Sequence, residues 1–169
     1  MNPSVSLKKK ICMLGGYAVG KTSLVRHFVE GIFSEKYQIT IGVKIDKKTV
    51  SVGDASLTLM LWDIAGEEEK FAIPPTYLTG AAGFLLVMDG TRKQSYDQAV
   101  DIFERVEQTL GTGLPFVAVL NKEDLDAQWE MPDSALDEMR ARGWQVVTSS
   151  ARLGTGVEEA FSLLAEQLV

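Results

Sequence analysis

Short runs of apolar residues alternate along this chain with longer segments in which apolar residues recur every three or four positions. The short runs are typical of buried strands, and the three-to-four spacing is typical of a helix with one buried face. The pattern predicts strands near residues 9–14, 44–52, 56–62, 83–88, 116–120 and 145–148. It predicts helices over residues 21–30, 93–110, 132–142 and 156–167.

Two kinds of strand are expected from these runs. Residues 83–88 and 116–120 are apolar almost throughout, as central parallel strands buried on both faces are. Residues 56–62 instead carry leucine at alternate positions, and the turn at residues 52–54 suits a hairpin with the preceding strand. We therefore predict a three-layer α/β domain, with a mostly parallel six-stranded sheet and one antiparallel edge strand. Such a sheet binds its ligands at the carboxyl ends of the strands.

The composition narrows the class of protein. A chain of 169 residues fits one domain spanning residues 1–169, of which residues 1–7 are expected to be flexible. The net charge of −6 argues against a nucleic-acid partner and against a polybasic membrane anchor. The single cysteine, Cys12, excludes a disulfide within the chain, which favours a cytoplasmic protein.

No membrane attachment is apparent in the sequence. The N-terminus lacks the apolar core of a signal peptide, and no apolar run approaches transmembrane length. The last four residues contain no cysteine for a prenyl group, so we expect no membrane anchor in this chain. Either the protein works in solution or an anchoring tail lies outside this sequence.

The most specific motif lies between the first predicted strand and the first predicted helix. Residues 15–22 read Gly-Gly-Tyr-Ala-Val-Gly-Lys-Thr, which matches the phosphate-loop pattern G-x-x-x-x-G-K-S/T. In such a loop successive backbone N–H groups surround the phosphates, Lys21 reaches the β- and γ-phosphates, and the Thr22 hydroxyl ligates Mg²⁺. The predicted nucleotide contacts here are Gly15, Tyr17, Ala18, Val19, Gly20, Lys21, Thr22 and Ser23.

Further along the chain, three residues suit the same metal and phosphates. Asp63 follows the third predicted strand and could hold Mg²⁺ through water, and Gly66 could offer its N–H to a γ-phosphate. The Thr40 hydroxyl could reach the metal, although Thr40 taken alone fits a strand-capping residue equally well. The predicted metal site therefore consists of Thr22, Thr40 and Asp63.

A base-recognition motif follows the fifth predicted strand. The Asp124 carboxylate could accept two N–H bonds from the N1 and 2-amino edge of guanine, a donor pair that adenine lacks. Asn121 would bridge neighbouring loops, and the stem of Lys122 would pack along the base. A residue of the segment after the last strand could give a backbone N–H to the guanine carbonyl, and the candidates are Ser150, Ala151 and Arg152. Each of these segments alone could be a solvated turn, whereas their order at successive strand ends argues for one site.

Together these motifs resemble the Ras superfamily of small GTPases, with the Rab proteins as the most similar branch. The resemblance runs from about Lys9 to the C-terminus and rests on all five nucleotide motifs in the family's order. It implies a P-loop NTPase G domain that binds GTP and GDP with Mg²⁺ and hydrolyses GTP. It also implies that Phe33 lies against the guanine face and that Tyr37 closes over the phosphates.

The same resemblance implies two switch segments, at residues 32–43 and 63–79. Both would be ordered by the γ-phosphate and Mg²⁺, and effector and regulator proteins would bind through them. The residues implied in catalysis are Glu67, Lys21 and Thr40.

Three features depart from the family pattern. Glu67 stands where the family has a water-orienting glutamine, and a carboxylate can accept hydrogen bonds but cannot donate them. Glu67 could instead act as a base, or it could belong to a solvated acidic loop face. Tyr17 stands where a small residue usually leaves room for an activating arginine, so we expect hydrolysis to be slow or stimulated in another way. Pro74 and Pro75 should shorten or displace the helix of the second switch.

Three functions are compatible with the motifs. The first is a switch that hydrolyses GTP, and the second is a guanine-nucleotide-binding module with little or no hydrolysis. The third is an enzyme that transfers phosphoryl groups from ATP, which the base motif at Asp124 disfavours. We favour the switch.

Overall fold

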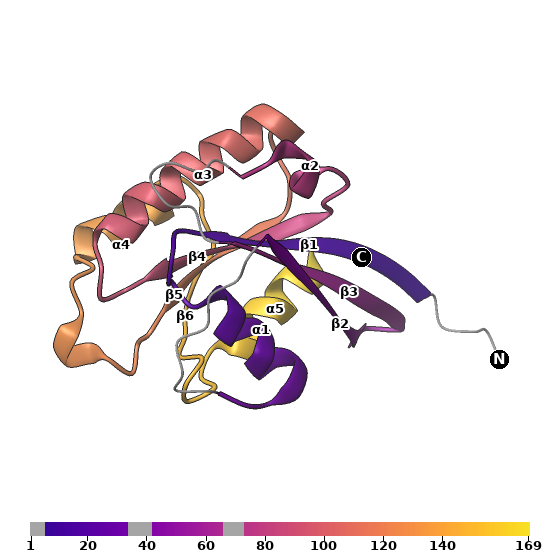
Figure 1. Cartoon of the computed structure of the whole chain (residues 1–169), viewed down its shortest axis with the longest axis horizontal. Helices are drawn as coiled ribbons and strands as arrows, with labels where there is room; N and C mark the ends of the chain where they lie inside the picture. Colours follow the sequence, from indigo (N-terminus) through magenta and orange to yellow (C-terminus); the bar gives the residue numbers. More distant parts are fainter. Residues whose placement is uncertain (1–5, 34–41, 66–72) are drawn as a thin grey trace.

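The structure, a computed structural model, describes residues 6–33, 42–65 and 73–169. A six-stranded sheet runs through the middle of the molecule in the order β2-β3-β1-β4-β5-β6 (Figure 1). The strands are β1 (Ser6–Gly15), β2 (Val43–Val52), β3 (Ala55–Ile64), β4 (Gly83–Asp89), β5 (Phe116–Asn121) and β6 (Val146–Thr148). Only β2 is antiparallel to its neighbour, which confirms the predicted sheet.

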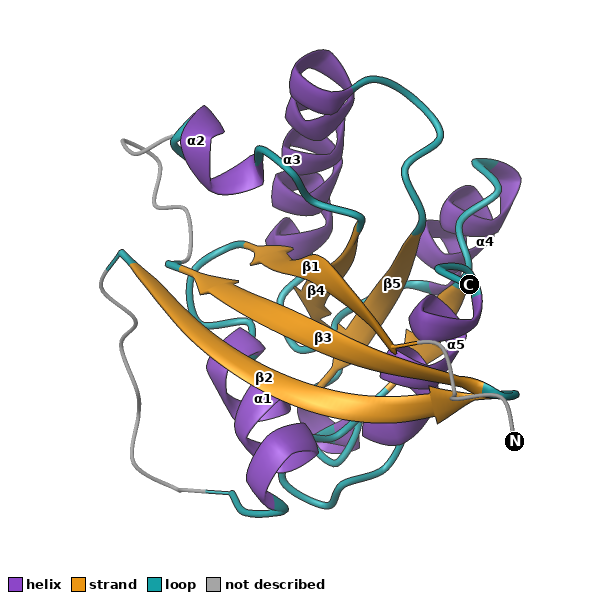
Figure 2. Ribbon diagram, turned by 90° about the vertical axis from the view of Figure 1, so that its right-hand side faces the viewer, coloured by secondary structure: helices purple, strands orange, loops and turns teal. Residues whose placement is uncertain are grey.

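Helices cover both faces of this sheet and make the three layers (Figure 2). One face packs against α1 (Lys21–Glu30) and α5 (Val157–Glu166), and the other packs against α3 (Gln94–Leu110) and α4 (Asp133–Ala141). The short helix α2 (Pro75–Leu78) lies on the α3 side, and a 3-10 turn, η1 (Asp126–Gln128), follows β5. No helix of residues 6–33, 42–65 and 73–169 has the length and apolar character needed to cross a membrane.

The pleat of the strands divides the core between the two faces. In β1, Ile11 and Met13 face α1 and α5, whereas Cys12 and Leu14 face the α3 side, and all four are fully buried. Because burial on both faces leaves no position for a polar side chain, the central strands read as continuous apolar runs. Along β3, Leu57, Leu59 and Leu61 are fully buried while the residues between them are half-buried, as their alternation predicted, and burial becomes continuous at Asp63 and Ile64.

Some boundaries differ from the prediction for identifiable reasons. β1 begins at Ser6, because Ser6 and Leu7 pair with β3, so the strand reaches into the segment expected to be flexible. Helix α2 has four residues and begins directly at Pro75, with Pro74 before it. A proline is tolerated in the first turn of a helix, because the N–H groups there have no acceptor within the helix. The described helix is short, as expected from this pair of prolines.

The fold brings several loops to one edge of the sheet. The parallel strands β1, β3, β4, β5 and β6 all point their carboxyl ends the same way, so the segments that follow them meet there. This edge of the sheet contains the phosphate-loop sequence, Asp63, Asp89, the Asn121 motif and the residues after β6.

Candidate nucleotide-binding site

The phosphate-loop sequence forms the turn between β1 and α1, as the motif predicted. Two glycines in this turn are required by close neighbours. A Cβ on Gly15 would fall on the carbonyl oxygen of Val87 in β4, and one on Gly20 would fall on the side-chain amide of Asn121. Gly20 has φ +103, a conformation that side chains rarely adopt. The loop therefore lies directly against β4 and β5.

Lys21 begins α1 and turns its side chain back into the loop. Its ammonium donates to the carbonyl oxygens of Gly15 (3.2 Å) and Gly16 (3.1 Å), and the residue is only 6% exposed. Burial lowers the pKa of Lys21 to about 8, while the Asp63 carboxylate acts in the opposite direction. An anion beside this ammonium would stabilise its charged form, so the site is chemically suited to phosphate.

The two described members of the predicted metal site lie in contact. The Thr22 hydroxyl, in the first turn of α1, donates to Oδ2 of Asp63 at the end of β3, at 2.6 Å. Asp63 is 1% exposed. A hydroxyl and a carboxylate are the hard oxygen ligands that Mg²⁺ prefers, so these residues fit the metal. Within the described part of the chain, no three His, Cys, Asp or Glu side chains gather into a further metal site.

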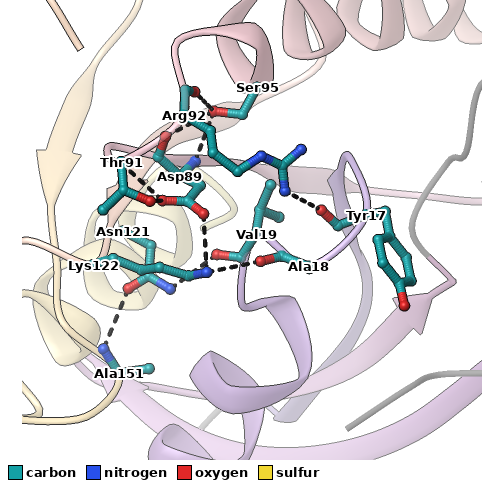
Figure 3. A network of polar contacts seen from close by, with 10 residues as sticks. All are labelled: Tyr17, Ala18, Val19, Asp89, Thr91, Arg92, Ser95, Asn121, Lys122 and Ala151. Atoms are coloured by element: carbon teal, nitrogen blue, oxygen red, sulfur yellow. Dashed lines mark hydrogen bonds and ion pairs between the residues drawn. The ribbon is translucent and has the colours of Figure 1, made fainter. Parts of the chain in front are cut away.

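Asn121, the last residue of β5, contacts both the phosphate loop and the loop after β6 (Figure 3). Its side-chain N–H donates to the carbonyl oxygen of Val19 (3.1 Å). Its side-chain oxygen accepts from the Ser149 hydroxyl (3.0 Å) and from the backbone N–H of Ala151 (3.2 Å). The phosphate loop is thereby fixed against the loop that follows β6.

Asp124 lies on the same side, and its carboxylate is oriented by the loop after β6. The Ser150 hydroxyl donates to Oδ1 of Asp124 at 2.9 Å and accepts from the backbone N–H of Leu153 at 3.0 Å. Ser150 is fully buried, whereas Asp124 is half-buried and Arg152 is exposed. The predicted base-recognition residues therefore come together from two strand ends.

Sequence reasoning missed a cluster at the end of β4. Asp89 is 1% exposed, and its Oδ2 forms an ion pair with the Lys122 ammonium at 2.9 Å. Its Oδ1 accepts from the Thr91 N–H (2.9 Å) and hydroxyl (2.7 Å). Lys122 also donates to the carbonyl oxygen of Ala18 (2.9 Å), and Arg92 donates to that of Tyr17 (2.9 Å). Asp89 follows the predicted strand at residues 83–88 as Asp63 follows the predicted strand at residues 56–62, so the same rule would have found it.

The remaining predicted residues are distributed as follows. Tyr17, Ala18 and Val19 lie in the loop itself, and Ser23 lies in the first turn of α1. Phe33 is 38% exposed and is the last residue of the described range 6–33, shortly after α1. Four predicted residues lie outside the described residues, namely Tyr37, Thr40, Gly66 and Glu67.

The described end of the second predicted switch is attached to the sheet. The Lys10 ammonium lies 3.6 Å from the centroid of the Trp62 ring and donates to the carbonyl oxygen of Thr79 at 2.8 Å. Trp62 and Tyr77 are both half-buried against the core on the α3 side. A cation over an aromatic face is attractive, so Lys10 links β1, β3 and the end of α2.

The sequence of this chain matches a known protein family. A sequence profile described as "Ras family" matches residues 10–169, nearly the whole chain. The chain belongs to the Ras family. Its similarity to Rab proteins, at 31–32% identity in three of them, makes it a Rab-like small GTPase.

Three relatives illustrate the similarity of this Rab-like chain. Ras-related protein Rab-13 of Canis lupus familiaris is 32% identical over 161 residues, which cover 95% of this chain and 79% of the relative. Ras-related protein Rab-21 of Geodia cydonium is 32% identical over 165 residues, covering 97% and 72%. Ras-related protein RABF2b of Arabidopsis thaliana is 31% identical over 164 residues, covering 96% and 82%.

Proposed function

We propose that this Rab-like GTPase binds GTP and GDP with Mg²⁺, hydrolyses GTP slowly and presents its two switch segments to partner proteins according to the bound nucleotide. One observation carries the proposal. A single loop, residues 15–20, is contacted from α1 by Lys21 and from the base side by Asn121. A phosphate site and a base site that share one loop fit a nucleoside phosphate.

The phosphates would be held by backbone N–H groups of the loop and by Lys21. The N-terminus of α1 adds its dipole at the same place, which favours an anion further. Thr22 and Asp63 would hold Mg²⁺, with Thr40 as the proposed third residue. When bound, the metal would neutralise charge on the terminal phosphates and order the first switch.

Guanine would be selected by Asp124. Its carboxylate has one oxygen held by Ser150, which fixes the plane of the carboxylate. N1–H and the 2-amino group of guanine could then donate to it side by side, whereas adenine would leave the carboxylate without matching donors. Lys122 would support this loop through its contacts with Asp89 and Ala18.

Hydrolysis is the step in which this chain departs from its family. Glu67 would have to orient the attacking water without an amide N–H, and it brings negative charge toward the polyphosphate. Tyr17 adds a bulky ring to the loop beside the γ-phosphate. Both features favour a slow intrinsic rate, and they also support a second candidate function, a guanine-nucleotide module with hardly any turnover.

Single-turnover release of phosphate from bound GTP distinguishes these functions. We expect slow but measurable, Mg²⁺-dependent hydrolysis in the wild type, and we expect Glu67→Gln to raise the rate about ten- to a hundredfold by restoring water orientation. Glu69→Gln removes a neighbouring carboxylate and should leave the rate unchanged.

Tyr17→Gly completes the series by clearing the ring from the loop, and it should raise the rate or leave it unchanged. A fast wild type that both Glu67→Gln and Tyr17→Gly slow down would contradict the proposed slow rate. No phosphate release from any variant that still binds GTP would favour the module instead.

A further inference from the structure

Five successive carbonyl groups of the phosphate loop accept hydrogen bonds from side chains. Lys21 donates to those of Gly15 and Gly16. The next three carbonyls accept from residues outside the loop, namely Tyr17 from Arg92, Ala18 from Lys122 and Val19 from Asn121. Figure 3 shows these last three donors converging on the loop from the ends of β4 and β5.

These contacts determine where the backbone N–H groups of the loop point. In a planar trans peptide the C=O of one residue and the N–H of the next point in opposite directions. A donor that holds the carbonyl of Tyr17 therefore also directs the N–H of Ala18 toward the opposite side. Ala18 needs such support, because its φ of +60 is uncommon for a residue with a side chain.

Hydrogen bonds hold the backbone of Arg92 in place, so its guanidinium can orient the Tyr17 carbonyl. Its backbone N–H donates to the carbonyl oxygen of Asp89 at 3.0 Å. Its own carbonyl accepts from the N–H of Ser95 (3.0 Å) and from the Ser95 hydroxyl (2.7 Å). Ser95 is fully buried, and Asp89 is fixed by Thr91 and Lys122. The guanidinium thus reaches the loop from a backbone held at both ends.

We propose that Arg92 is a positioning residue for nucleotide binding, which acts through the Tyr17–Ala18 peptide to hold the Ala18 N–H toward the phosphates. The proposal rests on the proposed function. A residue that orders the loop before the nucleotide arrives lowers the cost of binding without contacting the γ-phosphate. Its loss should therefore weaken GDP and GTP equally.

The test compares Arg92→Ala with the wild type by measuring association and dissociation rates of fluorescently labelled GDP and of a labelled, non-hydrolysable GTP analogue. We expect about tenfold weaker binding of both nucleotides. Arg92→Lys retains a cationic donor and should restore part of the affinity. Arg140→Ala removes an exposed arginine from α4 and should leave both affinities unchanged.

Two further readouts separate positioning from other roles. The ³¹P chemical shifts of bound GDP should move in Arg92→Ala, because the loop N–H groups that surround the phosphates are displaced. The thermal midpoint of the nucleotide-free protein should change little, because Arg92 makes one side-chain hydrogen bond within the described residues.

The outcomes bear on the proposal in different ways. A loss confined to the GTP analogue would overturn it in favour of direct contact with the γ-phosphate. Unchanged affinities, or a lower thermal midpoint with normal affinity in the folded protein, would overturn it in favour of a structural role. A wild type that binds neither nucleotide would instead refute the proposed function.

Discussion

Asp124→Asn is expected to change the preferred base from guanine to xanthine. The substitution replaces a charged acceptor with a neutral amide. The amide has one acceptor oxygen and one NH₂ donor, so it cannot accept from both the N1–H and the 2-amino group of guanine. Hydrogen bonds to charged groups contribute about 1.5–3 kcal/mol each, so guanine binding should weaken by about a hundredfold or more. Xanthine carries a carbonyl in place of the amino group and can accept from the new amide.

The measurement is competition between GDP and xanthosine diphosphate for the same labelled probe, in the wild type and in the variant. Glu123→Gln is the matched control, because it removes a neighbouring carboxylate whose partner is Thr155 rather than the base. That control should keep its guanine preference. If guanine preference also survives in Asp124→Asn, the role given to Asp124 is wrong.

Lys21→Met is expected to weaken the binding of both nucleotides strongly. The substitution keeps an unbranched side chain of similar length and removes the buried charge that would bind the phosphates. The variant cannot form the charge-assisted hydrogen bond from the ammonium to the β-phosphate, nor, in GTP, the one to the γ-phosphate. At about 1.5–3 kcal/mol per hydrogen bond, the affinity for GDP should fall by about ten- to a hundredfold and the affinity for GTP by more. Isothermal titration with GDP and Mg²⁺ measures this directly.

Stability controls separate this weaker binding from misfolding. Removing the ammonium leaves the carbonyls of Gly15 and Gly16 without their donor, but it also removes a charge whose burial depresses the pKa of Lys21. These effects oppose each other, so the thermal midpoint of the nucleotide-free protein should stay close to the wild type. Lys47→Met, at an exposed lysine of β2, should leave binding intact. Normal nucleotide affinity in Lys21→Met would contradict the phosphate role.

The fold could be predicted from sequence because burial determines the local pattern. Strands covered on both faces contain only apolar residues, as residues 84–88 do, and a strand with one covered face alternates, as β3 does. Strand ends were less certain, because pairing across the sheet extends a strand beyond its apolar run. Ser6 belongs to β1 through its pairing with Ser56, which no local pattern reveals.

Residues of the candidate site could be predicted where the residue type at a motif position has few structural roles other than ligand binding. Lys21, Thr22 and Asn121 stand in motifs whose spacing already implies a shared edge of the sheet. Arg92 could not be found in this way, because its partner is a backbone carbonyl and any residue at position 17 offers one. Asp89 could have been found, since it ends β4 as Asn121 ends β5.

Guanine-nucleotide binding itself is the central claim, and one competition experiment tests it most directly. Purified protein supplied with Mg²⁺ and labelled GDP is challenged with a large excess of ATP, and then with the same excess of GTP. We predict that ATP leaves the label bound and that GTP displaces it, because the proposed role of Asp124 is to accept the N1 and 2-amino donors of guanine, which adenine lacks. Displacement of the label by ATP, or failure to retain GDP or GTP at millimolar concentration, would contradict the account.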